Sequence, residues 1–231
     1  MTATTGKPRK WQNLAYLTGA CLGMAALALN ALPVGEWFHA KGPMNTGHER
    51  LACTSCHQNA PGSFRQQIQA NLRFALGLRQ SPADFGRLPV GNGECLACHE
   101  RPNDRHPVYR FLEPRFSRVR ATLQPHHCTS CHAEHQAKRV TLAETGFCRQ
   151  CHKDTKLRKD PIDVPHGDLI ARKQWDTCLG CHDFHGNHIM RTGDSVDKRT
   201  PAEKIRVYFE GGPTPYGTRL YHKAKQEGRD G

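Results

Sequence analysis

Apolar side chains are concentrated in one run near the N-terminus, and the rest of the chain is polar and irregular. No charged residue occurs from Leu14 to Val34. A helix of that length spans about 32 Å, close to the thickness of the hydrocarbon core of a bilayer. Beyond this run, frequent prolines limit helices to short segments, which we predict at residues 64–77 and 201–210. No stretch of the sequence predicts a strand.

Three interpretations of the apolar run remain open. Its length favours an uncleaved signal anchor over residues 13–34, and the basic residues before it place residues 1–12 in the cytoplasm and all later residues outside. A cleaved secretory signal is an alternative, because residues 26–28 resemble a cleavage site. A lipoprotein signal ending at Cys21 is the least favoured, since polar Thr18 stands where an aliphatic residue is typical. All three send the following chain to the periplasm, and the favoured one predicts a single-pass protein of the inner (cytoplasmic) membrane.

Ten of the eleven cysteines form five copies of the motif Cys-x-x-Cys-His. Two thiols at this spacing can each add to one vinyl group of a haem, and the following histidine then lies against the iron. The motifs therefore predict five covalently attached c-type haems. The expected thioether residues are Cys53, Cys56, Cys95, Cys98, Cys128, Cys131, Cys148, Cys151, Cys178 and Cys181, and the expected proximal iron ligands are His57, His99, His132, His152 and His182.

Zinc sites and redox dithiols also use Cys-x-x-Cys. A zinc site needs cysteine pairs matched to give four ligands, and five pairs leave one over. A thioredoxin-like dithiol uses one motif rather than five. Neither explains a histidine after every pair, so haem attachment is the favoured interpretation. It also suits an exported protein, in which unprotected thiols would oxidise.

The sixth ligand of each iron is predicted from the histidines outside the motifs. Ten such histidines are present, whereas Met44 and Met190 are the only methionines outside the start residue and the apolar run. Bis-histidine ligation is therefore expected, with lower potentials than His/Met ligation gives. The favoured distal ligands are His48, His106, His135, His166 and one of His185 and His188.

Composition and charge agree with an interior filled by cofactors. Hydrophobic residues make up 37% of the chain, and part of them lies in the N-terminal run, so little remains for a core. In the predicted helix, Phe64, Ile68, Leu72 and Leu76 would face either a porphyrin or the protein core. The net charge of +12 is explained as counter-charge for the haem propionates. No nucleic-acid-binding motif accompanies it, so nucleic acid is not a predicted partner.

The motifs, with further histidines at short offsets as in Cys-His-Ala-Glu-His, resemble the class III, low-potential multihaem cytochromes over residues 48–190. With its anchor, the chain is also similar to the membrane-anchored tetrahaem quinol dehydrogenases of the NapC/NirT type, although it has five sites rather than four. It is similar as well to the anchored pentahaem subunit of alternative complex III. These resemblances imply electron transfer among quinol, membrane complexes and periplasmic acceptors.

We therefore predict a mostly α-helical chain with little regular structure, in which a multihaem cytochrome c domain at residues 35–190 follows the transmembrane helix. Residues 191–231 form a polar C-terminal tail that either docks or extends freely. The predicted function is electron transfer without catalysis, and the predicted partners are the inner membrane and other redox proteins or a respiratory or photosynthetic complex. Quinol oxidation beside Trp37, Phe38 and His39 is a subsidiary hypothesis.

Two alternatives require an iron with an open position: a multihaem reductase of small nitrogen or sulfur oxyanions, and a haem-based sensor. Pentahaem nitrite reductases replace one motif histidine by lysine, and no motif here does so. Carbon monoxide binding by the reduced protein would distinguish both alternatives from an electron carrier.

Overall fold

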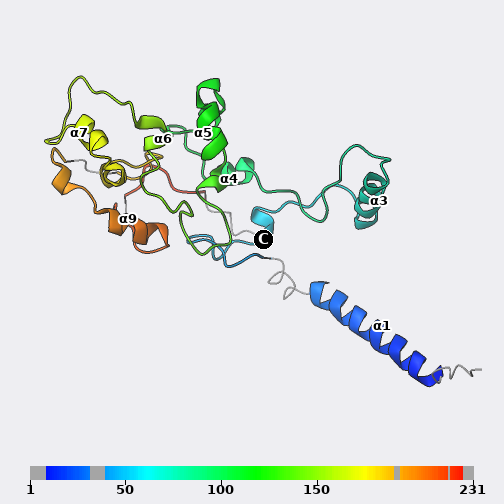
Figure 1. Cartoon of the computed structure of the whole chain (residues 1–231). Helices are drawn as coiled ribbons and strands as arrows, with labels where there is room; N and C mark the ends of the chain where they lie inside the picture. The colour runs from blue at the N-terminus through cyan, green and yellow to red at the C-terminus, as the bar shows by residue number, and fades with distance from the viewer. Residues whose placement is uncertain (1–8, 32–39, 190–192, 218, 226–231) are drawn as a thin grey trace, which may run out of the picture. The chain divides into compact units, whose positions relative to one another are not determined.

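The computed structural model describes residues 9–31, 40–189, 193–217 and 219–225. The chain divides into two compact units, Met1–Pro43 and Met44–Gly231. The helix α1 belongs to the first unit, and all other helices belong to the second (Figure 1).

Helix α1 (Arg9–Ala31) is a continuous helix of 23 residues. Its segment Lys10–Leu29 has a mean hydropathy of 1.3, and its side chains are exposed. By length and composition this helix is able to cross a membrane, a test that an N-terminal signal sequence also passes. The predicted N-terminus up to residue 8, the end of the predicted anchor at 32–34 and the aromatic group at 37–39 lie outside the described residues.

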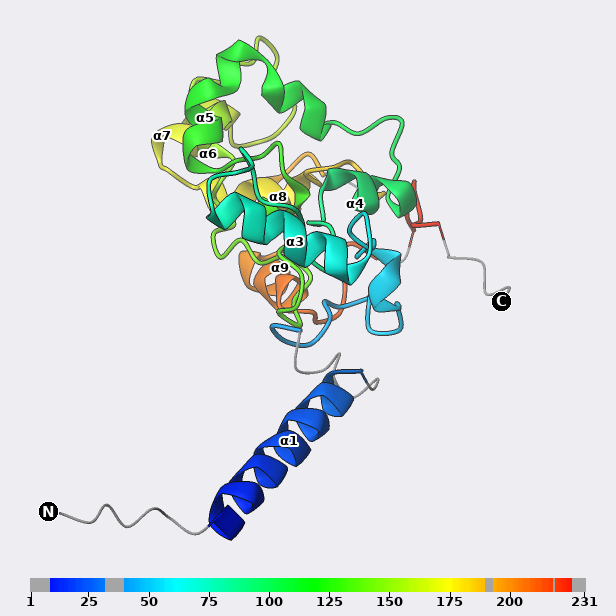
Figure 2. The same cartoon turned by 90° about the vertical axis from the view of Figure 1, so that its right-hand side faces the viewer.

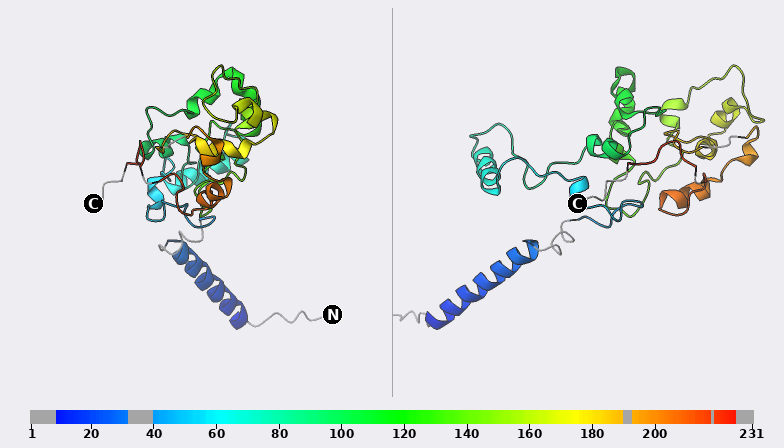
Figure 3. Two further views of the ribbon diagram at one scale, coloured as in Figure 1. Left: turned by 90° about the vertical axis from the view of Figure 1, so that its left-hand side faces the viewer. Right: turned by 180° about the vertical axis from the view of Figure 1, so that it is seen from behind.

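Short helices joined by irregular segments build the second unit, as Figures 2 and 3 show. Two isolated bridges, Asn59 with Arg87 and His188 with Leu220, are the only β pairing among the described residues. The prediction of a mostly helical chain without strands is confirmed. The helices are η1 (Cys53–Ser55), α3 (Phe64–Ala75), α4 (Asn92–Cys98), η2 (Val108–Leu112), η3 (Pro114–Phe116), α5 (Ser117–Thr122), η4 (Cys128–Ser130), α6 (Arg149–His152), α7 (His166–Ala171), η5 (Trp175–Thr177), α8 (Cys178–Cys181), η6 (Val196–Lys198) and α9 (Ala202–Phe209).

Helix α3 confirms the helix predicted from apolar spacing, but it packs through polar side chains. Ser63 and Gln66 form a capping box at its start. Buried Gln67 donates from Nε2 to Ala60 O at 3.1 Å and accepts at Oε1 from Gly86 N at 2.9 Å. The apolar stripe Phe64, Ile68, Leu72 and Leu76 is exposed, so it does not pack into the protein core.

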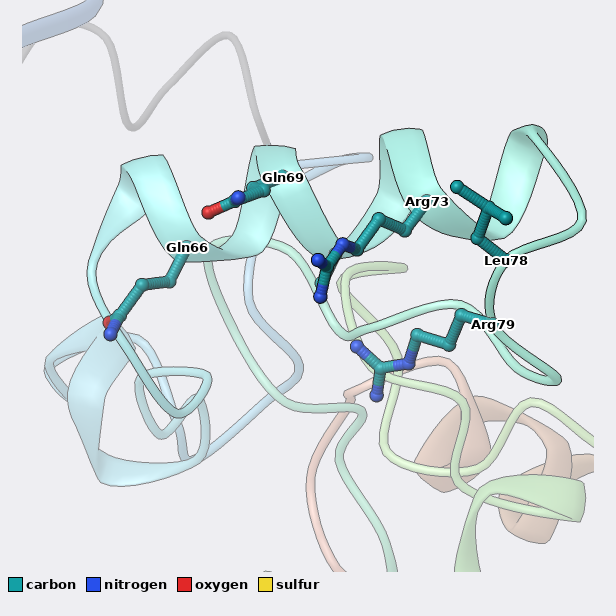
Figure 4. A pocket seen from close by; sticks show the side chains of 6 residues that line it. Gln66, Gln69, Arg73, Leu78 and Arg79 are labelled. Carbon is teal, nitrogen blue, oxygen red and sulfur yellow. The ribbon is translucent and has the colours of Figure 1, made fainter.

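A polar hollow lies on another side of α3. It is lined by Gln66, Gln69, Ala70, Arg73, Leu78 and Arg79, and the two arginine guanidinium groups point to the same side (Figure 4). It contains no cysteine or histidine of the predicted sites.

The protein core of the second unit is small, as its composition predicts. Phe147, Leu179 and Ile205 form the buried cluster, and Ile205 is fully enclosed. Leu179 belongs to α8 and Ile205 to α9, so this cluster attaches the C-terminal segment to the fifth cysteine motif. Helix α9 also confirms the second predicted helix.

The described part of the C-terminal segment is folded onto the cysteine-rich region. Arg139 N and Val140 N both donate to Phe209 O, at 2.8 and 3.0 Å. Tyr216 Oη donates to Leu179 O at 3.3 Å. At Gly180, in α8, a Cβ atom would lie 2.6 Å from Thr200 O. Only glycine permits this approach, and the described part of the predicted tail therefore packs against the fifth motif.

Candidate functional site

All five Cys-x-x-Cys-His motifs adopt the same local structure, a single helical turn. In each, the histidine amide donates to the carbonyl of the first cysteine, four residues earlier. This turn places both cysteines on one side and brings the histidine directly after them. The donor–acceptor distances are 2.8 Å for His57 and Cys53, 2.9 Å for His99 and Cys95, 3.0 Å for His132 and Cys128, 2.9 Å for His152 and Cys148, and 2.8 Å for His182 and Cys178.

Each motif histidine faces one histidine from elsewhere in the chain. We number the sites 1 to 5 in the order of the motifs. The ring centres are 6.3 Å apart for His57 and His135 at site 1, 5.9 Å for His99 and His48 at site 2, 6.2 Å for His132 and His185 at site 3, 6.2 Å for His152 and His106 at site 4, and 6.2 Å for His182 and His166 at site 5.

These separations are a test of whether a metal fits between the rings. A metal–imidazole nitrogen bond is about 2.0–2.1 Å long, and two trans imidazoles on one metal therefore have ring centres about 6.3 Å apart. Imidazoles in van der Waals contact would be closer: the rings of His126 and His127, neighbours in sequence, are 4.0 Å apart. The histidine pairs thus have the spacing that a haem iron with two axial imidazoles requires.

His188 is the one predicted distal candidate that faces no motif histidine. Its Nδ1 bonds to Asp183 Oδ2 at 2.7 Å, and its ring packs against Tyr208 and Tyr216. Of the two alternatives, the geometry favours His185, since it is the one opposite His132.

The distal imidazoles are oriented through their Nδ1 atoms. His48, His185 and His166 bond to the carboxylates of Glu134, Asp104 and Asp160, at 3.0, 3.1 and 2.9 Å. His106 bonds instead to the carbonyl of Phe184, at 2.5 Å. With Nδ1 as the donor, Nε2 carries the free lone pair, which is the tautomer that binds a metal.

Burial keeps several of the facing imidazoles neutral. It lowers the pKa of His99 and His132, and it lowers the pKa of His106 despite the opposing hydrogen bond to Phe184 O. Neutral imidazole is the form that coordinates a metal. At His48 the hydrogen bond to Glu134 outweighs burial and raises the pKa.

The first cysteines of neighbouring motifs are in contact. The thiols of Cys95 and Cys128 lie close enough for each to shift the pKa of the other, and the same holds for Cys148 and Cys178. None of the motif cysteines forms a disulfide. Among the residues that the structure describes, no group of three or more His, Cys, Asp or Glu side chains could hold a metal ion, so the zinc interpretation finds no four-ligand site.

Sequence analysis missed the residues that orient the imidazoles. Glu134 lies inside the segment Cys-His-Ala-Glu-His, and Phe184 lies between His182 and His185, so both were adjacent to recognised ligands. Asp104 lies two residues before His106 in the sequence, but the imidazole that bonds to its carboxylate is that of His185. That contact joins distant parts of the chain and leaves no local signal.

Comparison with known proteins agrees with this arrangement. Residues 46–153 match the model of the family described as cytochrome c3, a span that contains the first four motifs. Over the residues that it covers, the match supports a multihaem c-type cytochrome, a class associated with electron transfer. No curated protein and no solved structure matches the chain.

Proposed function

We propose that the chain binds five c-type haems, each through two cysteines and two histidines, and that it passes electrons in the periplasm while tethered to the inner membrane. The observation that supports this most directly is the set of five histidine pairs, because every motif histidine has its own facing partner at the spacing of two axial ligands. Haem iron supplies a one-electron couple when it is bound.

The protein residues in this proposal hold and tune the cofactor. The cysteines attach each macrocycle, the proximal and distal histidines occupy both axial positions, and the orienting carboxylates fix the distal rings. Two imidazoles at every site leave no position for a substrate. This favours an electron carrier over a reductase or a gas sensor, both of which need an open iron position.

Contacts between sites 2 to 5 support a path for electrons. The thiols of Cys95 and Cys128 interact, as do those of Cys148 and Cys178, so these cysteines would hold the haems of sites 2 and 3, and those of sites 4 and 5, near one another. Phe184 connects the two pairs, because its ring lies 4.3 Å from that of His106 (site 4) and 4.9 Å from that of His185 (site 3). The protein thereby sets separation and orientation, which is its contribution to cofactor chemistry.

Helix α1 supports the membrane part of the proposal, by length and apolar composition. In this arrangement a quinol-linked membrane donor would deliver electrons, and a periplasmic or complex-bound acceptor would receive them. A carbonate wash of bacterial membranes should leave the protein in the pellet, and recovery in the soluble periplasm would contradict the anchor. Proteins that co-purify in mild detergent would identify donor and acceptor.

Ligand binding to the reduced protein tests the bis-histidine sites. A pyridine haemochrome assay and the intact mass should give five haems, and the reduced wild-type protein should bind no carbon monoxide. His166→Ala removes the distal ligand of site 5 and should create one carbon monoxide-binding haem. His188→Ala is the matched control, since this histidine faces no motif histidine, and it should create none. Fewer than five haems, or wild-type binding of a full equivalent, overturns the proposal.

A further inference from the structure

Three of the distal ligands share a feature that His106 lacks, a carboxylate at the ring nitrogen remote from the iron. The pairs are Glu134 with His48 at site 2, Asp104 with His185 at site 3, and Asp160 with His166 at site 5, at 3.0, 3.1 and 2.9 Å.

Each of these carboxylates is fixed by a second hydrogen bond. Each carboxylate accepts from a backbone amide: Glu134 Oε1 from Asn45 N at 2.7 Å, Asp104 Oδ1 from His106 N at 2.9 Å, and Asp160 Oδ2 from His166 N at 2.6 Å. In Glu134 and Asp160 this oxygen is not the one bonded to the ring, whereas Asp104 Oδ1 also lies 3.3 Å from His185 Nδ1. The side chains are 28, 13 and 18% exposed. They are therefore held in place and largely removed from water, which strengthens their electrostatic effect.

Site 4 differs in the chemistry of its acceptor. His106 Nδ1 faces the carbonyl oxygen of Phe184, and the Phe184 ring stacks on the imidazole with an interplanar angle of 10°. A carbonyl is a neutral acceptor and draws the Nδ1 proton less strongly than a carboxylate does.

A carboxylate acceptor makes the imidazole a stronger electron donor to the iron. A more strongly donating ligand stabilises the ferric state relative to the ferrous state, and a nearby negative charge acts in the same direction. We propose that Glu134, Asp104 and Asp160 are positioning residues that lower the reduction potentials of sites 2, 3 and 5 below that of site 4. Of these four sites, site 4 is then the first to be reduced. This inference rests on the proposed function; site 1 is outside the comparison.

Amide substitutions in the holoprotein test the inference. Glu134→Gln, Asp104→Asn and Asp160→Asn keep the side-chain shape and remove the charge. Each should move one of the five components of a potentiometric titration to more positive potential and alter one low-spin ferric signal in the EPR spectrum. Asp197→Asn is the matched control, because this side chain is 98% exposed, and it should change neither measurement.

A measurement on the unaltered protein adds an independent test. In NMR spectra of stepwise reduced protein, the haem assigned to site 4 through contacts of His106 with Phe111 and Phe184 should be reduced before those of sites 2, 3 and 5. Five low-spin haems with unshifted components in all three variants, or site 4 reduced after those sites, overturn the inference and leave the proposed function intact. A wild-type protein with fewer than five haems overturns both.

Discussion

The imidazole rings of His132 and His185 lie with their centres 6.2 Å apart, although one belongs to the third cysteine motif and the other follows the fifth. Site 3 is therefore completed by a segment distant in sequence. His188, only three residues further along the chain, points instead to Asp183 and two tyrosines.

This difference predicts unequal effects of the same substitution at neighbouring histidines. His185→Met should give one haem His/Met ligation and move one component of the redox titration to more positive potential, because a thioether ligand raises the potential. His188→Met should leave all five components in place. Equal shifts in both variants, or a shift only for His188→Met, would contradict the assignment of His185 to site 3.

The close approach of Gly180 to Thr200 predicts a steric effect. A Cβ at Gly180 would lie 2.6 Å from Thr200 O, so Gly180→Ala should force the C-terminal segment away from α8 and cost about 1–3 kcal/mol of unfolding free energy. Chemical unfolding and limited proteolysis near Arg199 would measure this. Gly167→Ala in α7, where a Cβ meets nothing within 4 Å, is the control, and we expect it to be neutral or stabilising by about 0.5–1 kcal/mol.

Asp183 predicts a specific pH dependence of stability. Burial opposes its ionisation, but hydrogen bonds from the side chain and amide of His188 prevail and lower the pKa to about 2. Because this lies below the value of about 3.9 in an unfolded chain, ionised Asp183 stabilises the fold above about pH 4, and the stabilisation disappears as pH falls towards 2.

Asp183→Asn should therefore reduce the free energy of unfolding by about 2 kcal/mol at pH 6 and by little near pH 2. Urea unfolding followed by circular dichroism at several pH values would show it. Exposed Asp154, changed to Asn, should have no such effect. A deficit of Asp183→Asn that is the same at pH 6 and pH 2 would rule out this explanation.

Buried Gln67 predicts a local loss of stability around α3. Gln67→Ala removes the acceptor of Gly86 N and the donor to Ala60 O, which should cost about 1–3 kcal/mol. Hydrogen exchange at the Gly86 amide should become faster. Gln69→Ala, at an exposed position of the same helix, should leave that rate unchanged.

Local sequence patterns predicted the parts of the structure that depend on neighbours in the chain. Spacing of apolar residues predicted α3 because helical periodicity is local, whereas the helical turns at the cysteine motifs, such as α4 and α8, were not predicted. The exposure of Phe64 and Ile68 was not predictable, since α3 packs through Gln67 and Asn71, which carry no hydrophobic signal.

The pairing of the histidines also lay beyond the sequence. His106 faces His152, and His48 faces His99, through contacts that only the folded chain creates. The histidines outside the motifs could be named as candidate ligands, but their number did not show which of them faces which motif histidine. The same holds for Asp104 and His185, whose contact joins segments far apart in the second unit. Contacts between residues far apart in the sequence leave no periodic pattern, so the sequence alone does not predict them.

At each of the five sites, the histidine that faces the motif histidine comes from another part of the chain. Each site therefore depends on a segment outside its own motif. The segment that matches cytochrome c3 ends at residue 153. His132 lies within this segment, but the histidine that faces it, His185, lies after the segment ends. Deleting residues 178–231 would therefore strip a ligand from the third site as well as abolish the fifth. If the proposed function holds, the chain cannot be shortened one haem at a time, and the haem sites form a single cooperative assembly rather than a row of interchangeable modules.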